Sequence, residues 1–254
     1  MRNKPENIRP TLVKDYEVNY RDLPFENVLR YYRNISTLRF INKVVHKRVL
    51  EIGCGPEPLF KIFSDYDKMT IVEPGELYYK MAIEEAREDP RIVFYNDRVE
   101  SLLEFLQEDN FDIIIIGGFL HEVSNPDLVL ATVRKIASNN THIYSFVPNA
   151  KSFHRLLAYE MGLISSIYQM SEHDLLFQRQ VVFDKDMING LIANNGFQIL
   201  DSATYFIKPF SHKQMSGLIE SGVVGQKVLD GLYNMVKYMP DLGSEIYTEF
   251  RIND

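Results

Sequence analysis

The sequence has a single cysteine, Cys54, which excludes an intramolecular disulfide. Its most apolar run, residues 113–116, is far shorter than the roughly 20 residues that a membrane-spanning helix needs. Residues 1–10 are polar and lack the apolar core of a signal peptide. From these absences we expect a cytoplasmic protein with no disulfide and no membrane partner.

Positive charge is also scarce, with 28 Lys and Arg against 35 Asp and Glu and a net charge of -7. No basic run stands out, so we expect no nucleic-acid partner. The 254 residues are 45% hydrophobic and 25% charged, values typical of a globular protein with a packed core. This length suits one α/β domain with additions. The oligomeric state stays open, and a homodimer is compatible with the sequence.

The middle of the chain alternates short β-branched runs with helical patterns, which favours a parallel sheet covered on both faces. Residues 111–116 end in four consecutive isoleucines, a run that is apolar on both faces, as in a central strand. We therefore predict an α/β fold with a doubly wound, seven-stranded, mostly parallel Rossmann-like sheet. The strands of this core are expected at residues 48–52, 69–72, 92–95, 111–116 and 142–147, and its helices at 58–65, 76–88, 99–107 and 127–137.

The flanks of this core, which we place at residues 46–148, differ in character. Aromatic residues at helical spacing in residues 1–45 predict an N-terminal helical cap. Residues 149–183, rich in Met, His and Tyr, predict a lid inserted over the substrate. In residues 184–254 the sheet is completed by an antiparallel edge hairpin, with a helix at 184–195, strands at 197–207 and 245–252, and a helical stretch at 212–239.

A glycine-rich turn follows the first predicted strand at Gly53, Cys54 and Gly55. Glycines there let the backbone approach a ligand that a Cβ atom would keep away. The fingerprint of dinucleotide-binding folds needs a further glycine three residues later, where this chain has Pro58. The turn therefore disfavours a nicotinamide-dependent dehydrogenase.

Acidic residues stand at three successive strand ends. Glu51 precedes the glycine turn, where a carboxylate would repel a pyrophosphate but suits a cationic amino group. Glu73 ends the second strand and could accept hydrogen bonds from ribose hydroxyls. Asp97 follows the third strand, where it could receive the amino group of an adenine. Together they indicate a cationic adenosyl ligand, although Glu51 pairing with a buried cation and Asp97 capping a helix are the alternatives.

Residues 49–55, Glu73 and residues 111–123 resemble class I S-adenosylmethionine-dependent methyltransferases. The resemblance covers residues 46–148, and the last two strands fit the family's edge hairpin. It implies S-adenosyl-L-methionine as the cofactor. One position departs from the family pattern, because Glu57 stands where many members have a third glycine. The resemblance implies that Gly53 and Gly55 contact the cofactor, with Glu73 at its ribose, Asp97 near the adenine and Gly117 near the methionine end. The full set of cofactor-binding residues that we expect is Glu51, Gly53, Cys54, Gly55, Glu73, Pro74, Asp97, Arg98 and Gly117.

His121 and Glu122 follow the fourth strand, at the edge where doubly wound sheets place their reactants. Methyl transfer to a hydroxyl needs an aligned acceptor and a group that takes its proton, and histidine suits that role. We predict His121 as the catalytic base, oriented by Glu122. The alternative is that His121 packs under the cofactor and Glu122 caps the next helix. The histidine spacing predicts no metal site.

Residues 147–155 resemble methyltransferases that act on sugars and related small metabolites. The predicted lid carries four basic residues that could bind an anionic or polyhydroxyl substrate, since arginine suits phosphate or carboxylate. They are His154, Arg155, His173 and Arg179. We expect methyl transfer to an oxygen, less readily a nitrogen, of a sugar or nucleotide-linked sugar of surface-glycan or natural-product biosynthesis. An aromatic or quinone-type acceptor and a non-catalytic S-adenosylmethionine-binding module remain as alternatives.

Overall fold

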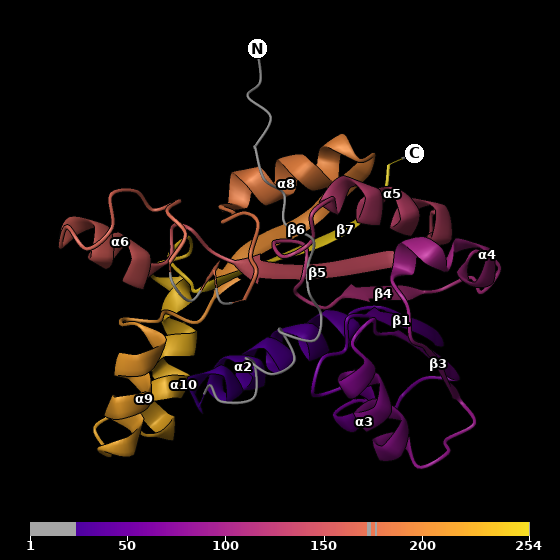
Figure 1. Ribbon diagram of the computed structural model, residues 1–254, viewed down its shortest axis with the longest axis horizontal. Coiled ribbons are helices and arrows are strands. Elements are labelled where there is room, and N and C mark those ends of the chain that lie inside the picture. The colour runs from indigo at the N-terminus through magenta and orange to yellow at the C-terminus, as the bar shows by residue number, and fades with distance from the viewer. Residues whose placement is uncertain (1–23, 172–173, 176, 254) are drawn as a thin grey trace.

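The computed structural model describes residues 24–171, 174–175 and 177–253. A seven-stranded sheet runs through its centre in the order β3-β2-β1-β4-β5-β7-β6 (Figure 1). The predicted doubly wound sheet with an antiparallel edge hairpin is thereby confirmed. Its strands are β1 (Arg48–Ile52), β2 (Lys68–Val72), β3 (Ile92–Tyr95), β4 (Ile113–Ile116), β5 (His142–Pro148), β6 (Phe197–Tyr205) and β7 (Glu245–Ile252).

The strand order reverses between β1 and β4. From β1 the chain proceeds outward through β2 and β3, and then returns to β4 on the other side of β1. β4 and β5 are parallel, whereas β7 is antiparallel to both β5 and β6. The loops that leave the carboxyl ends of β1 and β4 therefore diverge, and open sheets of this kind bind ligands at that point.

Helices cover both faces of the sheet because the central strands are apolar on both sides. In β4, Ile114 and Ile116 belong to one buried cluster, while Ile113 and Ile115 belong to the cluster on the opposite face. Figure 1 shows one layer of helices above the sheet and another below it. The first contains α4 (Leu103–Leu106), α5 (Pro126–Ile136) and α8 (Lys185–Asn194), and the second contains α2 (Pro24–Ile41) and α3 (Glu76–Ala86).

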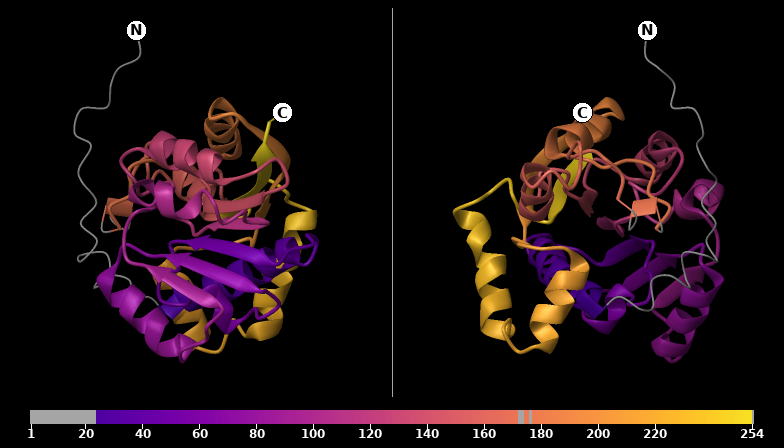
Figure 2. Two further views of the ribbon diagram at one scale, coloured as in Figure 1. Left: turned by 90° about the vertical axis from the view of Figure 1, so that its right-hand side faces the viewer. Right: turned by 60° about the vertical axis from the view of Figure 1, so that its left-hand side comes forward.

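A third buried cluster joins α2 to α9 (His212–Glu220) and α10 (Gln226–Asn234). Figure 2 shows α9 and α10 as a helical hairpin beside α2 and outside the sheet. Tyr32 of α2 stacks on Tyr233 of α10, with ring centroids 5.0 Å apart. The part of the predicted N-terminal cap that the structure describes is thus a helix anchored to the hairpin, and residues 1–23 lie outside the described residues.

The segment 149–183 leaves the end of β5 and returns to the same place. The Ala150 amide donates to the Phe183 carbonyl at 2.7 Å, so the two ends of the segment are joined. The Gln180 amide donates to the His121 carbonyl at 2.8 Å, which holds the returning strand against the loop after β4. Between them α6 (Phe153–Glu160) projects beyond the sheet (Figure 1).

Three predicted helices are shorter than the sequence pattern indicated. Residues 58–65 form only the 3-10 turn Leu59–Lys61, and the Leu59 amide that begins this turn donates to the Glu51 carboxylate. Residues 99–107 divide at Leu102, and the stretch 212–239 divides where Gly222 takes a left-handed φ of +75°. Of the helices in the described residues, none is both long and apolar enough to cross a bilayer.

Candidate active site

The turn after β1 packs directly against the loop after β4. Gly53 takes a φ of +78° and its amide donates to the Val72 carbonyl at 2.8 Å. The Gly117 amide donates to the Ile52 carbonyl at 2.8 Å, and a Cβ added to Gly117 would lie 2.0 Å from the Gly53 carbonyl oxygen. Gly55, with a φ of +57°, has nothing within 4 Å of its added Cβ position. The turn therefore leaves open space in front of Gly55 that a ligand can occupy.

We predict that Gly117→Ala destabilises the protein strongly, because its methyl group overlaps backbone that cannot move away. Overpacking of this kind lowers the free energy of unfolding by about 1–3 kcal/mol. The matched control is Gly190→Ala in the middle of α8, where nothing lies within 4 Å of the added Cβ. That change should stabilise the protein by about 0.5–1 kcal/mol. Urea unfolding of both variants measures the difference, and equal midpoints would contradict the close approach at Gly117.

Two buried carboxylates stand beside this turn. Glu51 Oε2 accepts from the Leu59 amide at 2.9 Å, and burial raises the pKa of Glu51 to about 8, with the charge of Glu73 adding to the effect. Glu73 Oε2 accepts from the Gly55 amide at 3.0 Å, and its Oε1 accepts from the Gly75 amide at 2.8 Å. Glu73 therefore fixes the glycine turn while facing the same pocket as Glu51.

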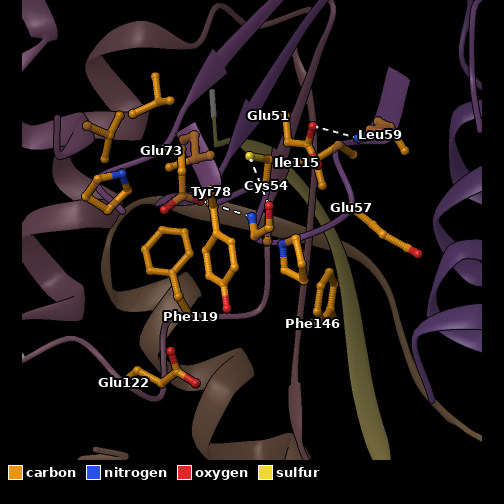
Figure 3. Close-up of a pocket in the computed structure, with 18 of the residues that line it drawn as sticks. Glu51, Cys54, Glu57, Leu59, Glu73, Tyr78, Ile115, Phe119, Glu122 and Phe146 are labelled. Carbon is orange, nitrogen blue, oxygen red and sulfur yellow. Dashed lines mark hydrogen bonds between the residues drawn. The ribbon is translucent and has the colours of Figure 1, made fainter. Parts of the chain in front are cut away.

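These residues line a small pocket of about 200 Å³ at the carboxyl ends of β1 and β2 (Figure 3). Cys54 lies in its wall, and burial raises the pKa of its thiol well above the ordinary value. Arg98 also reaches the wall, whereas Asp97 is exposed and accepts from the Arg98 amide at 2.7 Å. Of the expected cofactor residues, those at the wall are Glu51, Gly53, Cys54, Gly55, Glu73, Pro74, Arg98 and Gly117.

The wall of the small pocket fits an adenosyl ligand that carries a positive charge. Apolar side chains, among them Val72, Val99 and Phe119, offer surfaces for a flat ring. Glu51 and Glu73 supply hydrogen-bond acceptors, a cationic ligand would favour the ionised form of Glu51, and the open space at Gly55 admits a ligand against the backbone. Tyr78 of α3 also lines the pocket, and sequence reasoning missed it because a tyrosine in a helical pattern reads as ordinary core.

A larger cavity of about 1010 Å³ adjoins the small pocket. The two spaces share Arg33, Gly117, Glu122 and Phe146 in their walls. The cavity is bounded by α2, by the loop after β4, by the segment 149–183 and by the residues that lead into α9. A ligand in the small pocket and a second molecule in the large cavity would therefore meet at this shared wall.

His121 and Glu122 lie at the junction of the two spaces. His121 is 3% exposed, and its Nε2 lies 3.3 Å from Glu122 Oε1. Burial lowers the pKa of His121 below its ordinary value, so the imidazole is neutral near pH 7 and can accept a proton. The helix that follows is capped by Asn125, whose side chain accepts from the Leu128 amide. The capping alternative for Glu122 is therefore wrong.

The basic residues expected in the lid have different surroundings. Arg155 donates to the Ile167 and Gln169 carbonyls and to Asp174, so it holds the segment together. Arg179 also donates to Asp174, at 2.6 Å, although its buried Nε has no hydrogen-bond partner within the described residues. Burial opposes ionisation of Asp174, but Arg179 and hydrogen bonds from Ser171 lower its pKa well below the ordinary value.

His154, the next of these residues, lines the large cavity. Burial lowers the pKa of His154 well below its ordinary value. His173 lies outside the described residues.

Sequence reasoning missed several charged residues of the large cavity. Arg33 of α2 forms ion pairs with Glu26 and with Glu245 of β7, which ties α2 to the sheet. Lys208, just beyond β6, is 3% exposed. Its only signal in the sequence is that it interrupts an otherwise apolar run at residues 206–210, where a charge is unexpected.

The strand order and the glycine turn at the switch point define a class I, Rossmann-like methyltransferase fold. A family described as methyltransferase domain matches residues 26–202. The chain belongs to that family and is an enzyme of the S-adenosylmethionine-dependent methyltransferase class. No curated protein sequence matches it.

Solved structures show the same fold at low sequence identity. A possible histamine N-methyltransferase from Thermotoga maritima has 15% identity and a TM-score of 0.59, covering 94% of this chain and 97% of its own. The N-methyltransferase NodS from Bradyrhizobium japonicum, solved with S-adenosylhomocysteine, has 12% identity and a TM-score of 0.57, covering 95% and 97%. The [4+2]-cyclase SpnF has 15% identity and a TM-score of 0.56, covering 87% and 80%. Identities this low show the fold alone.

Proposed function

We propose that this enzyme transfers a methyl group from S-adenosylmethionine to an oxygen, less readily a nitrogen, of a small polar metabolite held in the large cavity. A sugar or a nucleotide-linked sugar of surface-glycan or natural-product biosynthesis is the acceptor class we favour. The observation that carries the proposal is the wall shared by the two spaces at Gly117, Glu122 and Phe146. A donor on one side and an acceptor on the other can be aligned there for in-line displacement.

The small pocket is the proposed cofactor site. Glu73 would accept hydrogen bonds from the ribose hydroxyls, and Glu51 would face the amino group of the methionine end. The adenine would lie toward Arg98 and Val99, with Asp97 at its edge. When bound, S-adenosylmethionine supplies a methyl group already activated by its positively charged sulfur.

The chain's own contribution to the reaction lies in placing the acceptor and taking its proton. His121, neutral near pH 7, would accept the proton of an acceptor hydroxyl at one of its ring nitrogens. Glu122, 3.3 Å away, would orient the ring and stabilise the imidazolium that forms. The segment 149–183 closes part of the cavity wall, and so keeps water from the reacting groups.

The proposal is tested with S-adenosylmethionine carrying a tritiated methyl group and pools of sugars and nucleotide sugars. We expect label in an acceptor and stoichiometric S-adenosylhomocysteine. Cofactor binding by calorimetry without transfer across broad pools would favour the non-catalytic module instead. A second candidate acceptor is an aromatic or quinone-type compound. It is favoured by the apolar side chains in the wall of the large cavity, such as Leu157, Met161 and Ile164. A tritium-labelled product found only in pools of aromatic compounds would favour this second acceptor class.

We predict that the affinity for S-adenosylhomocysteine rises with pH between about 6 and 8. The pKa of Glu51 is about 8 without ligand, so its carboxyl is mostly protonated at pH 7. A cationic amino group favours the ionised form, so binding strengthens as pH approaches 8 and levels off above it. Calorimetry over this range should show the rise in the wild type and a smaller one in Glu51→Gln. The same pH dependence in both proteins would remove Glu51 from the contact.

A further inference from the structure

Lys208 is a buried amine that pairs with no carboxylate of the residues that the structure describes. It lies between β6 and α9, is 3% exposed, and lines the large cavity. Its Nζ is 3.0 Å from His212 Nδ1, and no carboxylate of the described residues lies within 4 Å of it. Lysine is almost never buried in this way unless it is paired. The position therefore points to a partner other than the carboxylates of the described residues, such as a bound anion.

Two more nitrogen donors of the same cavity lack partners. His154 of α6 has a buried Nδ1, and Arg179 has a buried Nε, and neither makes a hydrogen bond within the described residues. After burial, the groups that lower the pKa of His154 most are Lys208, His212, Arg155 and Arg179, all of them basic. This part of the wall therefore gathers basic side chains and offers several N–H donors to one space. In Figure 1, α6 lies above α9 at the left of the view.

The nearby carboxylates already have partners. Asp174 binds Arg155 and Arg179, while Glu26 and Glu245 both bind Arg33. Tyr205 also donates to Glu245. Burial lowers the pKa of Lys208 to about 7, and the groups whose charges act on it are Glu26, Arg179, Glu245 and Asp174, with His212 in contact.

We propose that Lys208, His154 and Arg179 bind an anionic group of the acceptor, a carboxylate or a phosphate. Such a group would accept the hydrogen bonds that these donors lack, and charge-assisted bonds of this kind are among the strongest in proteins. His121 faces the same cavity, so an acceptor anchored here by its anion can present a hydroxyl toward the cofactor pocket. The inference rests on the proposed function and narrows its substrate class to acidic metabolites such as sugar acids and sugar phosphates.

The anion site is tested without turnover, by calorimetry on the full chain saturated with S-adenosylhomocysteine. Inorganic phosphate and acetate are titrated separately, which distinguishes the two anion sources. Lys208→Gln should weaken binding of the preferred anion by about 10- to 100-fold, the loss of one charge-assisted hydrogen bond. The matched control is Lys213→Gln, which removes the same charge from an exposed residue of the same cavity and should leave the affinity nearly unchanged. Equal losses in both variants, or no binding by the wild type, would overturn the proposal.

A second measurement needs no variant. In protein labelled with ¹³C-lysine, the Lys208 signal should titrate near pH 7 and shift to higher pH when the anion binds, since an anion favours the charged ammonium. An unchanged titration in the presence of bound anion would place that anion elsewhere.

The acceptor itself is tested by splitting a metabolite pool on an anion exchanger before the methyl-transfer assay. Label only in the retained, acidic fraction supports the inference. Label in the neutral fraction leaves the enzyme a methyltransferase but contradicts the anion site. If neither fraction becomes labelled, the result contradicts the proposed function. It then also contradicts an acidic acceptor, even if calorimetry shows that free anions bind.

Discussion

His121→Asn is expected to lower kcat for methyl transfer by about 10²- to 10⁴-fold, the usual contribution of a general base. The cofactor affinity should change little, because His121 lines the large cavity and not the small pocket. Transfer of a labelled methyl group gives kcat, and calorimetry with S-adenosylhomocysteine gives the affinity. His142→Asn is the matched control, since His142 begins β5 at the opposite end of the sheet.

The pH dependence of kcat distinguishes His121 from other candidate bases. Because burial lowers its pKa below the ordinary value, activity that depends on neutral His121 should be level around pH 7 and fall only in more acidic solution. A fall centred near pH 7 would point to Lys208, whose pKa is about 7. Unchanged kcat in His121→Asn would move the base to another residue of the cavity, such as His154.

Glu73→Gln is expected to weaken S-adenosylhomocysteine binding by about 1–3 kcal/mol, or roughly 5- to 150-fold. Both carboxylate oxygens accept from backbone amides, those of Gly55 and Gly75, and an amide side chain can replace only one of these acceptors. The control is Glu57→Gln, in the same pocket wall, whose carboxylate is 41% exposed and pairs with Arg30. That variant should bind nearly as the wild type does, and equal losses would reject the special role of Glu73.

The ribose contact can be separated from the effect on the turn. With a 2′,3′-dideoxy analogue of S-adenosylhomocysteine, Glu73→Gln should cost much less than with the natural ligand, because the hydroxyls that Glu73 would bind are gone. If the substitution weakens both ligands equally, Glu73 acts only by holding the amides of Gly55 and Gly75.

The sheet could be predicted from local patterns because its strands are short, β-branched and apolar on both faces. β4 is the clearest case, since four consecutive isoleucines can be buried only in the middle of a covered sheet. The helices were harder to predict. Residues 58–65 have a helical pattern, yet only the 3-10 turn Leu59–Lys61 forms there, beside a tertiary contact of the Leu59 amide with the Glu51 carboxylate.

In the candidate site, too, some residues could be predicted from local sequence patterns and others could not. The glycine turn and Glu73 are predictable because strand ends and glycines mark the cofactor side of such sheets. His154 and Arg155 are neighbours in sequence and both line the cavity, but within the described residues His154 Nδ1 has no hydrogen-bond partner while Arg155 binds Asp174 and the Ile167 carbonyl. Lys208 shares a cavity wall with His154 only because the tertiary fold brings the segment between β6 and α9 to the same space as α6. Tertiary contacts of that kind leave no spacing in the sequence.

The central claim is that the methyl group passes from the small pocket to the large cavity through the wall they share. A crystal structure with S-adenosylhomocysteine bound tests it most directly. We predict the ribose against Glu73 and the sulfur at the shared wall, beside Gly117 and Glu122, facing the cavity that holds His121. A sulfur that faces away from that cavity, or a ligand seated in the large cavity itself, would contradict the account.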